Sequence, residues 1–332
     1  MTPAVAHWFA AAMTDASHAP HVPPATSLPR RRLLRAAGLA VPAAVLASTG
    51  TAAPAEAAAP APAPDTRLRD AEDELRRLEQ RYGARLGIHA RNTRTGQVLE
   101  HRAQEPFAMC STFKAVVAAA VLRDHGHCAP LDRLVFYPST DLLPNSPITT
   151  EHLDTGMTVG DLCAAAIQYS DNAAGNLLLR QVGGPAGLTR FFRTLGDPVS
   201  RLDRWETDLN AAVPEDPRDT TTPRALGRSY ARLLLGEALP AAERRQLVTW
   251  LKGSVTSGER FRAGLPKEWT VADKTGTGDY ASAHDVGVAW TTRGTPIALA
   301  VLSSKPTRDA AVDNHLIEAA ARVVARTLAP DE

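Results

Sequence analysis

WTVADKTGTGDYASAHDVGVAWTTRGTPIALAVLSS, from Trp269 to Ser304, is the stretch of sequence that decides the fold. It contains three apolar segments, WTVADKTG, AHDVGVAWTT and IALAVLSS, and the turn residues RGTP join the last two. Segments of this kind, bounded by glycine and proline, predict β-strands. Neighbouring strands joined by short turns pair antiparallel. The stretch therefore predicts an antiparallel sheet near the end of the chain.

Two more strands are expected far upstream of these three. ARLGIHARN (84–92) and QVLEHRA (97–103) flank the turn residues TRTG and predict a hairpin. Helices are expected beside the strands, at 65–82, where leucines recur at helical spacing, and at 313–329, which reads as an amphipathic helix. From Ser111 to about Trp250 helical patterns dominate.

The order of these elements predicts an α/β fold of the α+β type. An antiparallel five-stranded sheet, built from both ends of the chain and flanked by the terminal helices, would carry an inserted all-helical lobe. We expect one catalytic domain over 65–332, with a sheet lobe at about 65–108 and 255–332 and a helical lobe at about 109–254. A ligand site is expected in the cleft between the lobes.

The first 64 residues predict an export leader with an Ala/Pro-rich linker. A basic PRRRLLR (29–35) precedes the apolar AAGLAVPAAVLA and then small residues, which is the order of an export signal. Arg30 and Arg31, followed by an arginine and two leucines, fit the twin-arginine form. The apolar segment is short for a membrane span and contains Pro42. We expect a secreted protein without a stable membrane anchor, cleaved at about 57–65; a disordered basic tail is the alternative.

Composition excludes some classes of function. The chain has 332 residues, 44% hydrophobic and 22% charged, with a formal net charge of +1. Lysine and arginine are spread along it, so the massed positive charge of a nucleic-acid-binding protein is missing. HGHC (125–128) has residue types that bind zinc, but no second cluster at suitable spacing accompanies it. A turn that ends a helix is favoured there, and neither a metal nor an organic cofactor is expected.

Ser111 opens the apolar segment STFKAVVAAAVL, and Lys114 follows three residues later. Residues three apart share a helix face, so the Lys114 amine is expected to reach the Ser111 hydroxyl. Free N–H groups at a helix N-terminus favour negative charge developing on an oxygen beside them. The pair has the pattern of a nucleophile with its base. A serine at this place is also a common helix cap, so the motif alone does not establish catalysis.

Two more motifs combine polar residues with apolar surroundings. YSDNAAGN places Ser170 and Asn172 at the start of another helix, where such residues also serve as caps. WTVADKTGTGDY places Lys274 on a strand, where a solvated edge charge is the alternative. The small residues Thr275, Gly276 and Thr277 follow it, and a glycine there lets a substrate backbone approach closely.

In this order and spacing, STFK, SDN and KTG resemble the motifs of the class A serine β-lactamases and of the penicillin-binding D,D-peptidases. RWETDLN (204–210) separates the two families, because it resembles the omega-loop motif of the class A enzymes. A glutamate and an asparagine hold the hydrolytic water there, here Glu206 and Asn210, and Arg204 would pair with Asp219 inside the loop. A polar surface loop is the alternative. General similarity extends over almost all of the chain after Asp65.

The resemblance implies a role for each motif residue. Ser111 would attack the lactam carbonyl and form an acyl-enzyme, with Lys114 or Glu206 taking its proton. Ser170, held near Lys274, would pass a proton to the leaving nitrogen. Backbone N–H groups of Ser111 and Thr277 would form the oxyanion hole. The residues expected to bind the substrate or the water are Asn172, Asn210, Thr275, Gly276, Thr277 and Arg260.

Departures from the family pattern are equally informative. Many relatives carry an arginine at the position of Ala283, and Arg260 stands where other members place a substitute for it. An ordinary surface arginine is the alternative for Arg260. The disulfide of carbapenem-hydrolysing members would join Cys110 to the position of Gly278, so it is not expected here. Another family disulfide, from Cys163 to the position of Ala118, is likewise not expected.

These observations together predict an exported, monomeric class A serine β-lactamase. It would hydrolyse penicillins and cephalosporins as small-molecule substrates and confer antibiotic resistance. A D,D-peptidase acting on peptidoglycan peptides is disfavoured, because RWETDLN supplies a means of deacylation. An antibiotic sensor that stays acylated is the alternative from another class, and it should carry a membrane signalling segment.

Overall fold

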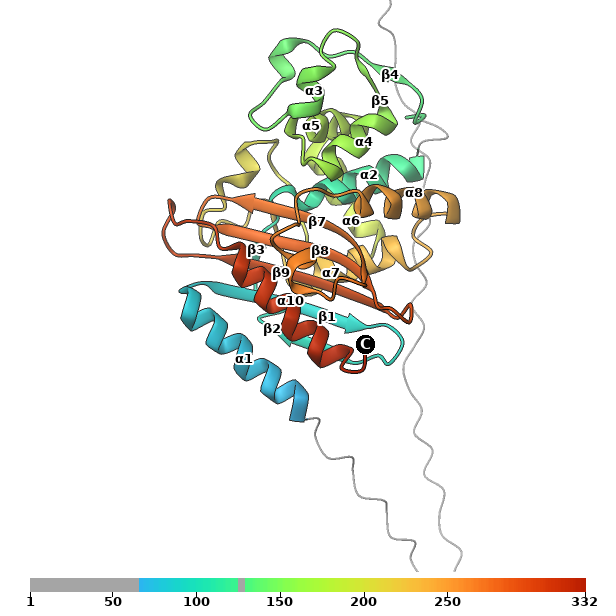
Figure 1. The fold of residues 1–332 in the computed structure, drawn as a ribbon. Helices are drawn as coiled ribbons and strands as arrows, with labels where there is room; N and C mark the ends of the chain where they lie inside the picture. Colours follow the sequence, from blue (N-terminus) through green and yellow to red (C-terminus); the bar gives the residue numbers. More distant parts are fainter. Residues whose placement is uncertain (1–65, 125–128) are drawn as a thin grey trace, which may run out of the picture. The chain divides into compact units, whose positions relative to one another are not determined.

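The computed structural model describes residues 66–124 and 129–332, drawn in colour in Figure 1. The expected export leader at 1–64 and the HGHC segment at 125–128 lie outside the described residues.

Five antiparallel strands form the main sheet, in the order β2-β1-β9-β8-β7. Their bounds are β1 Arg85–Asn92, β2 Val98–His101, β7 Thr270–Gly278, β8 Ser282–Trp290 and β9 Pro296–Ser304. Strand β1, from the start of the described chain, pairs with β9, from its end, over its whole length. The predicted five-stranded antiparallel sheet built from both ends of the chain is therefore confirmed.

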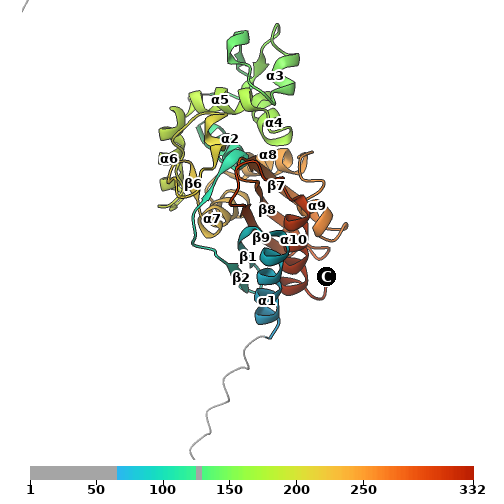
Figure 2. The same cartoon turned by 90° about the vertical axis from the view of Figure 1, so that its left-hand side faces the viewer.

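Two helices cover one face of this sheet, as Figure 2 shows. They are α1 Thr66–Tyr82 and α10 Asn314–Leu328. Each buries an apolar stripe, with Leu75 of α1 and Ile317 of α10 inaccessible to solvent. An ion pair of 2.8 Å between Arg326 and Glu74 also joins the two helices. The terminal helices thus complete the layer that the sequence predicts.

The opposite face of the sheet packs against the middle of the chain. The helices there are α2 Phe113–Asp124, α3 Pro147–Glu151, α4 Val159–Gln168, α5 Asn172–Gln181, α6 Gly184–Thr194, α7 Pro223–Leu234 and α8 Ala241–Lys252. The short helix α9 Phe261–Gly264 lies on the other face, where it packs against α10. Short strands pair as β3 Phe107–Ala108 with β6 Thr220–Thr221, and as β4 Leu134–Val135 with β5 Met157–Thr158. The described part of the chain also contains three 3₁₀ turns: η1 Cys110–Thr112, η2 Ser139–Asp141 and η3 Asp208–Ala211.

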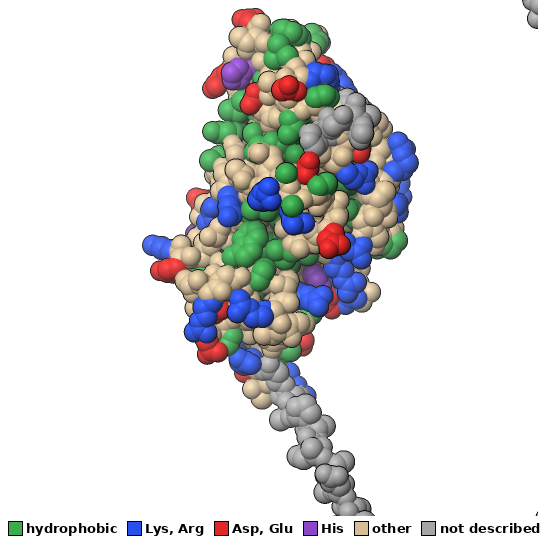
Figure 3. All heavy atoms as spheres, turned by 90° about the vertical axis from the view of Figure 1, so that its right-hand side faces the viewer, with side chains coloured by type: hydrophobic (Ala, Val, Ile, Leu, Met, Phe, Trp, Pro, Cys, Tyr) green, Lys and Arg blue, Asp and Glu red, His purple; other side chains and the backbone are tan. Residues whose placement is uncertain are grey.

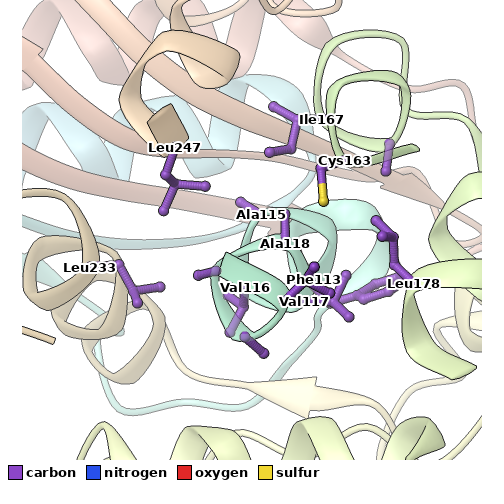
Figure 4. Packing of buried hydrophobic residues seen from close by; sticks show 14 of the residues in the cluster. Phe113, Ala115, Val116, Val117, Ala118, Cys163, Ile167, Leu178, Leu233 and Leu247 are labelled. Atoms are coloured by element: carbon purple, nitrogen blue, oxygen red, sulfur yellow. The ribbon is translucent and has the colours of Figure 1, made fainter. Parts of the chain in front are cut away.

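Helix α2 is the core of the helical region. Ten consecutive residues of it, from Phe113 to Leu122, are buried. Figure 4 shows α2 enclosed by side chains of its neighbours, such as Ile167 of α4, Leu178 of α5 and Leu247 of α8. A helix that is apolar all round belongs in the interior of a protein. Its first turn nevertheless carries Lys114, which needs a reason to be there.

The surface shows the same mixture of residue types as the sequence. Hydrophobic, basic and acidic side chains are interspersed on the face drawn in Figure 3. Within 66–124 and 129–332, none of the helices is long and apolar enough to span a membrane.

Candidate active site

Ser111 lies in the 3₁₀ turn η1, immediately before α2, and is 7% exposed. The α-helix begins at Phe113, two residues later than the sequence suggests, so Ser111 precedes the helix. Cys110 before it has a left-handed backbone, with φ of +46°. This conformation is uncommon for residues other than glycine and is found preferentially at functional sites.

Lys114 is fully buried in the first turn of α2. Its stem passes close to α5, where a Cβ at Gly175 would lie 2.9 Å from Cε of Lys114. The ammonium group donates hydrogen bonds to the carbonyl oxygen of Ser170 at 2.8 Å and to Oδ1 of Asn172 at 2.6 Å. It also lies 2.9 Å from Oε1 of Glu206. The charge buried in α2 is therefore paired and fully hydrogen-bonded.

Glu206 connects the nucleophile to the lysine. Its Oε1 accepts a hydrogen bond of 3.2 Å from the Ser111 hydroxyl and also contacts Lys114. Its Oε2 accepts one of 2.5 Å from Nδ2 of Asn210. Helical spacing predicts a direct hydrogen bond between Lys114 and Ser111, but none is present among the described residues. The Lys114 ammonium group contacts the Glu206 carboxylate instead. The Ser111 hydroxyl and the Lys114 ammonium group therefore contact the same oxygen of Glu206, Oε1.

Two sets of contacts hold the segment that carries Glu206. Arg204 pairs with Asp219 at 2.5 Å, as the resemblance implies. Asn176 of α5 donates to the Glu206 carbonyl oxygen and accepts from the Glu206 N–H, both at 3.0 Å. Asn176 was not predicted from the sequence. Its position four residues after Asn172 could have indicated a role in the site, because residues four apart lie on the same face of a helix.

Ser170 and Lys274 form the second polar pair. Nζ of Lys274 donates to the Ser170 hydroxyl at 3.1 Å and to the Thr275 carbonyl oxygen at 2.9 Å. Lys274 is fully buried, so the alternative of a solvated edge charge is wrong. Ser170 has a left-handed backbone with φ of +58°, and the cap of α5 is Asp171, which accepts from the Ala174 N–H at 2.9 Å. Ser170 is thus free of the capping role.

Burial changes the protonation of both lysines. The loss of hydration, and after it the positive charge of Lys114, lowers the pKa of Lys274 to about 7. Burial also lowers the pKa of Lys114, against which the Glu206 carboxylate acts to raise it. The site therefore contains two ammonium groups that give up a proton far more readily than a lysine in water.

Arg260 is only 6% exposed, so the alternative of an ordinary surface arginine is wrong. One terminal nitrogen donates to the carbonyl oxygens of Gly276 at 2.8 Å and His284 at 2.7 Å. The other donates to the Thr277 hydroxyl at 2.8 Å, and Nε donates to Asn314 at 2.8 Å. A guanidinium has five N–H donors, so one remains on the nitrogen beside Thr277. Burial lowers the pKa of Arg260.

A pocket of ≈ 360 Å³ between strand β7 and the helical region brings most of the predicted residues together. Lys114, Glu206 and Lys274 do not line it and are joined to its lining by hydrogen bonds. It is lined by Ser111, Asn145, Tyr169, Ser170, Asn172, Asn210, Thr256, Arg260, Thr275, Gly276 and Thr277. Asn145, Tyr169 and Thr256 were not predicted, since no motif marks them. The Thr256 hydroxyl hydrogen-bonds that of Thr275 at 2.6 Å and so extends the row of hydroxyl groups along β7.

Two free thiols occur among the described residues, and one of them makes a close approach to strand β7. A Cβ at Gly278 would lie 2.8 Å from Sγ of Cys110, which agrees with the place that the family pattern gives to a second cysteine. Cys110 and Cys163 are both free and buried. Among the residues that the structure describes, no three His, Cys, Asp or Glu side chains group in a way that could hold a metal ion.

Comparison with known proteins agrees with this arrangement. The profile of the beta-lactamase enzyme family matches residues 70–328. A solved structure described as the last common ancestor of Gram-negative bacteria class A β-lactamase is 48% identical, with a TM-score of 0.75 over 77% of this chain and 98% of that one. The chain belongs to the class A serine β-lactamases. It is therefore a hydrolase that acts on β-lactams.

Curated relatives of this β-lactamase span most of its length. Beta-lactamase AST-1 of Nocardia asteroides is 48% identical over 91% of this chain and 99% of its own. The carbapenem-hydrolyzing beta-lactamase KPC of Klebsiella oxytoca is 50% identical over 74% of this chain and 85% of its own. The family profile, over residues 70–328, covers the sheet, the helical region and the motifs from Ser111 to Thr277.

Proposed function

We propose that this β-lactamase hydrolyses penicillins and cephalosporins through an acyl-enzyme on Ser111. The observation that carries the proposal is the sharing of Glu206 Oε1 by the Ser111 hydroxyl and the Lys114 ammonium group. The hydroxyl already donates its proton toward a carboxylate, so attack on a carbonyl carbon needs no rearrangement of the base. This geometry favours Glu206 over Lys114 as the first acceptor of the serine proton.

In the acylation step, Oγ of Ser111 bonds the lactam carbonyl carbon and its proton passes to Glu206. The carbon–nitrogen bond then breaks, and the nitrogen takes a proton from the Ser170 hydroxyl. Lys274, 3.1 Å from that hydroxyl, replaces the proton. Backbone N–H groups of Ser111 and Thr277 would stabilise the oxyanion, at roughly 3 to 4 kcal/mol per donor.

In the deacylation step, Glu206 and Asn210 would hold the attacking water. Oδ1 of Asn210 is buried and has no donor among the described residues, while its Nδ2 binds Glu206. A water that donates one hydrogen to Asn210 and the other to Glu206 satisfies both acceptors. Before this step the proton that Glu206 took from Ser111 would return to Lys274 by way of Lys114 and Ser170, so that Glu206 is again a carboxylate. Glu206 would then take a proton from the water as its oxygen attacks the ester carbon, and Ser111 would receive that proton as the ester bond breaks. This pair is the feature that favours a hydrolase over an acylated sensor.

Substrate recognition would use the other polar residues of the pocket. Asn172 uses one N–H on the Pro144 carbonyl oxygen, at 2.7 Å, and its second N–H is left for the acylamino side chain. The Thr277 hydroxyl accepts from Arg260, so its own hydrogen is left for the substrate carboxylate. We propose that Arg260 acts through Thr277 and through its one remaining N–H.

We further propose that the protein acts as a monomer outside the cytoplasm after twin-arginine export. The support is the order of basic, apolar and small residues in 1–64. Replacing Arg30 and Arg31 by lysine should retain the precursor inside the cells of a host with this export route. Normal secretion of that variant would disprove the proposed route.

Turnover of a chromogenic cephalosporin and of benzylpenicillin tests the proposed reaction. We expect many turnovers per molecule, and neither turnover nor a covalent adduct from Ser111→Ala. Release of D-alanine from a D-Ala-D-Ala peptide without β-lactam turnover would favour the peptidase. A native protein that stops after one equivalent, with a stable adduct by intact mass, would favour the sensor.

A further inference from the structure

Three arginines follow one another at intervals of four on helix α7: Arg224, Arg228 and Arg232. Residues four apart share a helix face, and this face is turned away from the core that buries Leu226 and Tyr230. Arg224 is neutralised, because it forms a two-pronged ion pair with Glu100. Arg228 and Arg232 are exposed.

Strand β1 adds a fourth arginine beside this face. A Cβ at Gly87 would lie 2.7 Å from Pro223, and a Cβ at Gly227 would lie 3.0 Å from Cδ2 of His89. Two residues of strand and four of helix both advance about 6 to 7 Å, so the helix and the strand run level in the same direction. The next residue on this face of the strand is Arg91, which comes level with the end of the arginine row.

These side chains line a surface hollow of ≈ 530 Å³ between α7 and β1. Its lining includes three small residues, Gly227, Ala231 and Ala298. Its walls carry Arg91, Arg228 and Arg232 together with the Arg224–Glu100 pair. The pocket that contains Ser111 shares no lining residue with it.

The positive charge of this hollow is not balanced by the residues that the structure describes. None of them forms an ion pair or hydrogen bond with the side chains of Arg91, Arg228 or Arg232. The acid in the wall, Glu100, is already held by Arg224 and by His89, whose Nδ1 lies 2.8 Å away. Burial lowers the pKa of His89, and the charges of Arg228 and Arg224 add to this effect against that of Glu100.

We propose that this hollow binds a multivalent phosphate-type oxyanion, held by Arg91, Arg228 and Arg232. Guanidinium groups present paired N–H donors that match the oxygens of phosphate, and they remain charged at any physiological pH. Three of them around one hollow suit an anion with more than one charge. The source is either a free phosphate or pyrophosphate or the phosphodiester backbone of an anionic polymer. Binding there leaves the β-lactam pocket open.

Calorimetric titration of the full chain at constant ionic strength tests the proposal, with orthophosphate, pyrophosphate and poly(glycerol phosphate) as probes. We expect saturable binding of at least one probe and a raised thermal midpoint in its presence. Arg228→Ser/Arg232→Ser should weaken binding about tenfold or more, because two of the three charged contacts are lost. Tighter binding of the polymer would identify the polymer as the source, and tighter binding of pyrophosphate the free anion.

Arg322→Ser/Arg326→Ser is the matched control. It removes two exposed arginines four residues apart on α10, but each of these is already paired, with Glu318 and Glu74. We expect the control to bind as the native protein does, and both double variants to hydrolyse a cephalosporin at the native rate. Equal loss of binding in the two double variants, or no saturable binding of any probe, would overturn the proposal while leaving the proposed hydrolase reaction intact.

Discussion

Nζ of Lys114 lies 2.9 Å from Oε1 of Glu206, and both side chains are completely shielded from solvent. Removing one member of a buried ion pair leaves the other in an environment that penalises its charge. The Glu206 carboxylate therefore favours the charged form of Lys114, against the effect of burial. A proton that leaves Ser111 enters a pair that can share it over a short distance, and this coupling gives the first prediction.

Glu206→Gln should separate the two halves of the reaction. Without the carboxylate, the influence that raises the pKa of Lys114 disappears, so this lysine becomes more often neutral and can still accept the Ser111 proton. No base is left beside Asn210, and deacylation should slow by roughly 100- to 10,000-fold. Intact mass should then show an adduct on Ser111.

Glu215→Gln is the control for that experiment, because Glu215 is an exposed carboxylate a few residues further along the same segment. It should turn over a cephalosporin as the native enzyme does. Native turnover by Glu206→Gln would contradict the role of Glu206 in deacylation even though the family assignment stands.

The second prediction concerns Lys274, whose pKa burial lowers to about 7. Its ammonium form supplies the Ser170 hydroxyl with a proton and faces the substrate carboxylate. The catalytic efficiency, kcat/KM, should therefore decline as pH rises through the pKa of this lysine in the free enzyme. Lys274→Arg keeps its charge, so the decline should move to higher pH at a lower maximum. An unmoved decline would assign it to another group.

The same lysine should make stability depend on pH. Its pKa is about 7 in the folded state, against about 10.4 in an unfolded chain. Between these values the unfolded state binds more protons, so the contribution of Lys274 to the free energy of unfolding increases with pH. Below pH 7 the full penalty for burying the charge is present. In urea unfolding at pH 7 and pH 9, Lys274→Arg should show a smaller increase than the native protein.

Much of the fold could be predicted because its signals are local. The strand segments at 269–304 and 84–103 carry their own turns, and antiparallel pairing follows from the short connections. The pairing of β1 with β9 could be inferred only from the fold as a whole, since more than two hundred residues separate them. The start of α2 was placed two residues early, because the left-handed backbone at Cys110 leaves no mark in the sequence.

The candidate site was predictable in its residue types and less so in its contacts. The motifs predict Ser111 and Lys114 as site residues. They do not predict that both contact one oxygen of Glu206, because that contact depends on tertiary packing. Arg260 lines the pocket, yet three of its four hydrogen bonds go to Gly276, His284 and Asn314 rather than to Thr277. Asn176 was missed because its role is to hold a backbone segment, and no motif records such a role.

The third prediction separates Arg260 from the hydroxyl that it orients. Thr277→Val removes the hydroxyl between Arg260 and the substrate, whereas Thr277→Ser keeps it. KM for penicillins should rise in Thr277→Val and in Arg260→Ala, by an amount that corresponds to about 1 to 3 kcal/mol for a lost charge-assisted hydrogen bond. Thr277→Ser should keep a KM close to the native value.

The double variant Thr277→Val/Arg260→Ala tests whether the two residues act together. If its KM is no higher than that of either single variant, Arg260 and Thr277 act as one unit. Additive losses would mean that Arg260 binds the substrate by itself.

The last prediction concerns Asn176, which holds both the N–H and the carbonyl oxygen of Glu206 at 3.0 Å. Asn176→Ala leaves these two backbone groups without partners, at a cost of about 1 to 3 kcal/mol for each group that water cannot reach. Glu206 should then lose its fixed position beside Ser111 and Asn210. Because acylation has Lys114 as a second base and deacylation has none, pre-steady-state kinetics should show a burst and slow turnover.

Arg180→Ala provides the comparison for Asn176→Ala. Arg180 lies one turn further along α5, and its ion pair with Asp141, 2.6 Å long, is half exposed, so its loss should cost only about 0 to 1 kcal/mol. Both variants shorten a side chain on the same face of one helix, but only Asn176 contacts the segment of Glu206. Thermal unfolding of the two variants will measure how much stability each substitution removes. The size of the kinetic burst will show whether Glu206 has lost its position beside Asn210. Equal deacylation rates in the two variants would mean that the Arg204–Asp219 pair alone holds Glu206 in place.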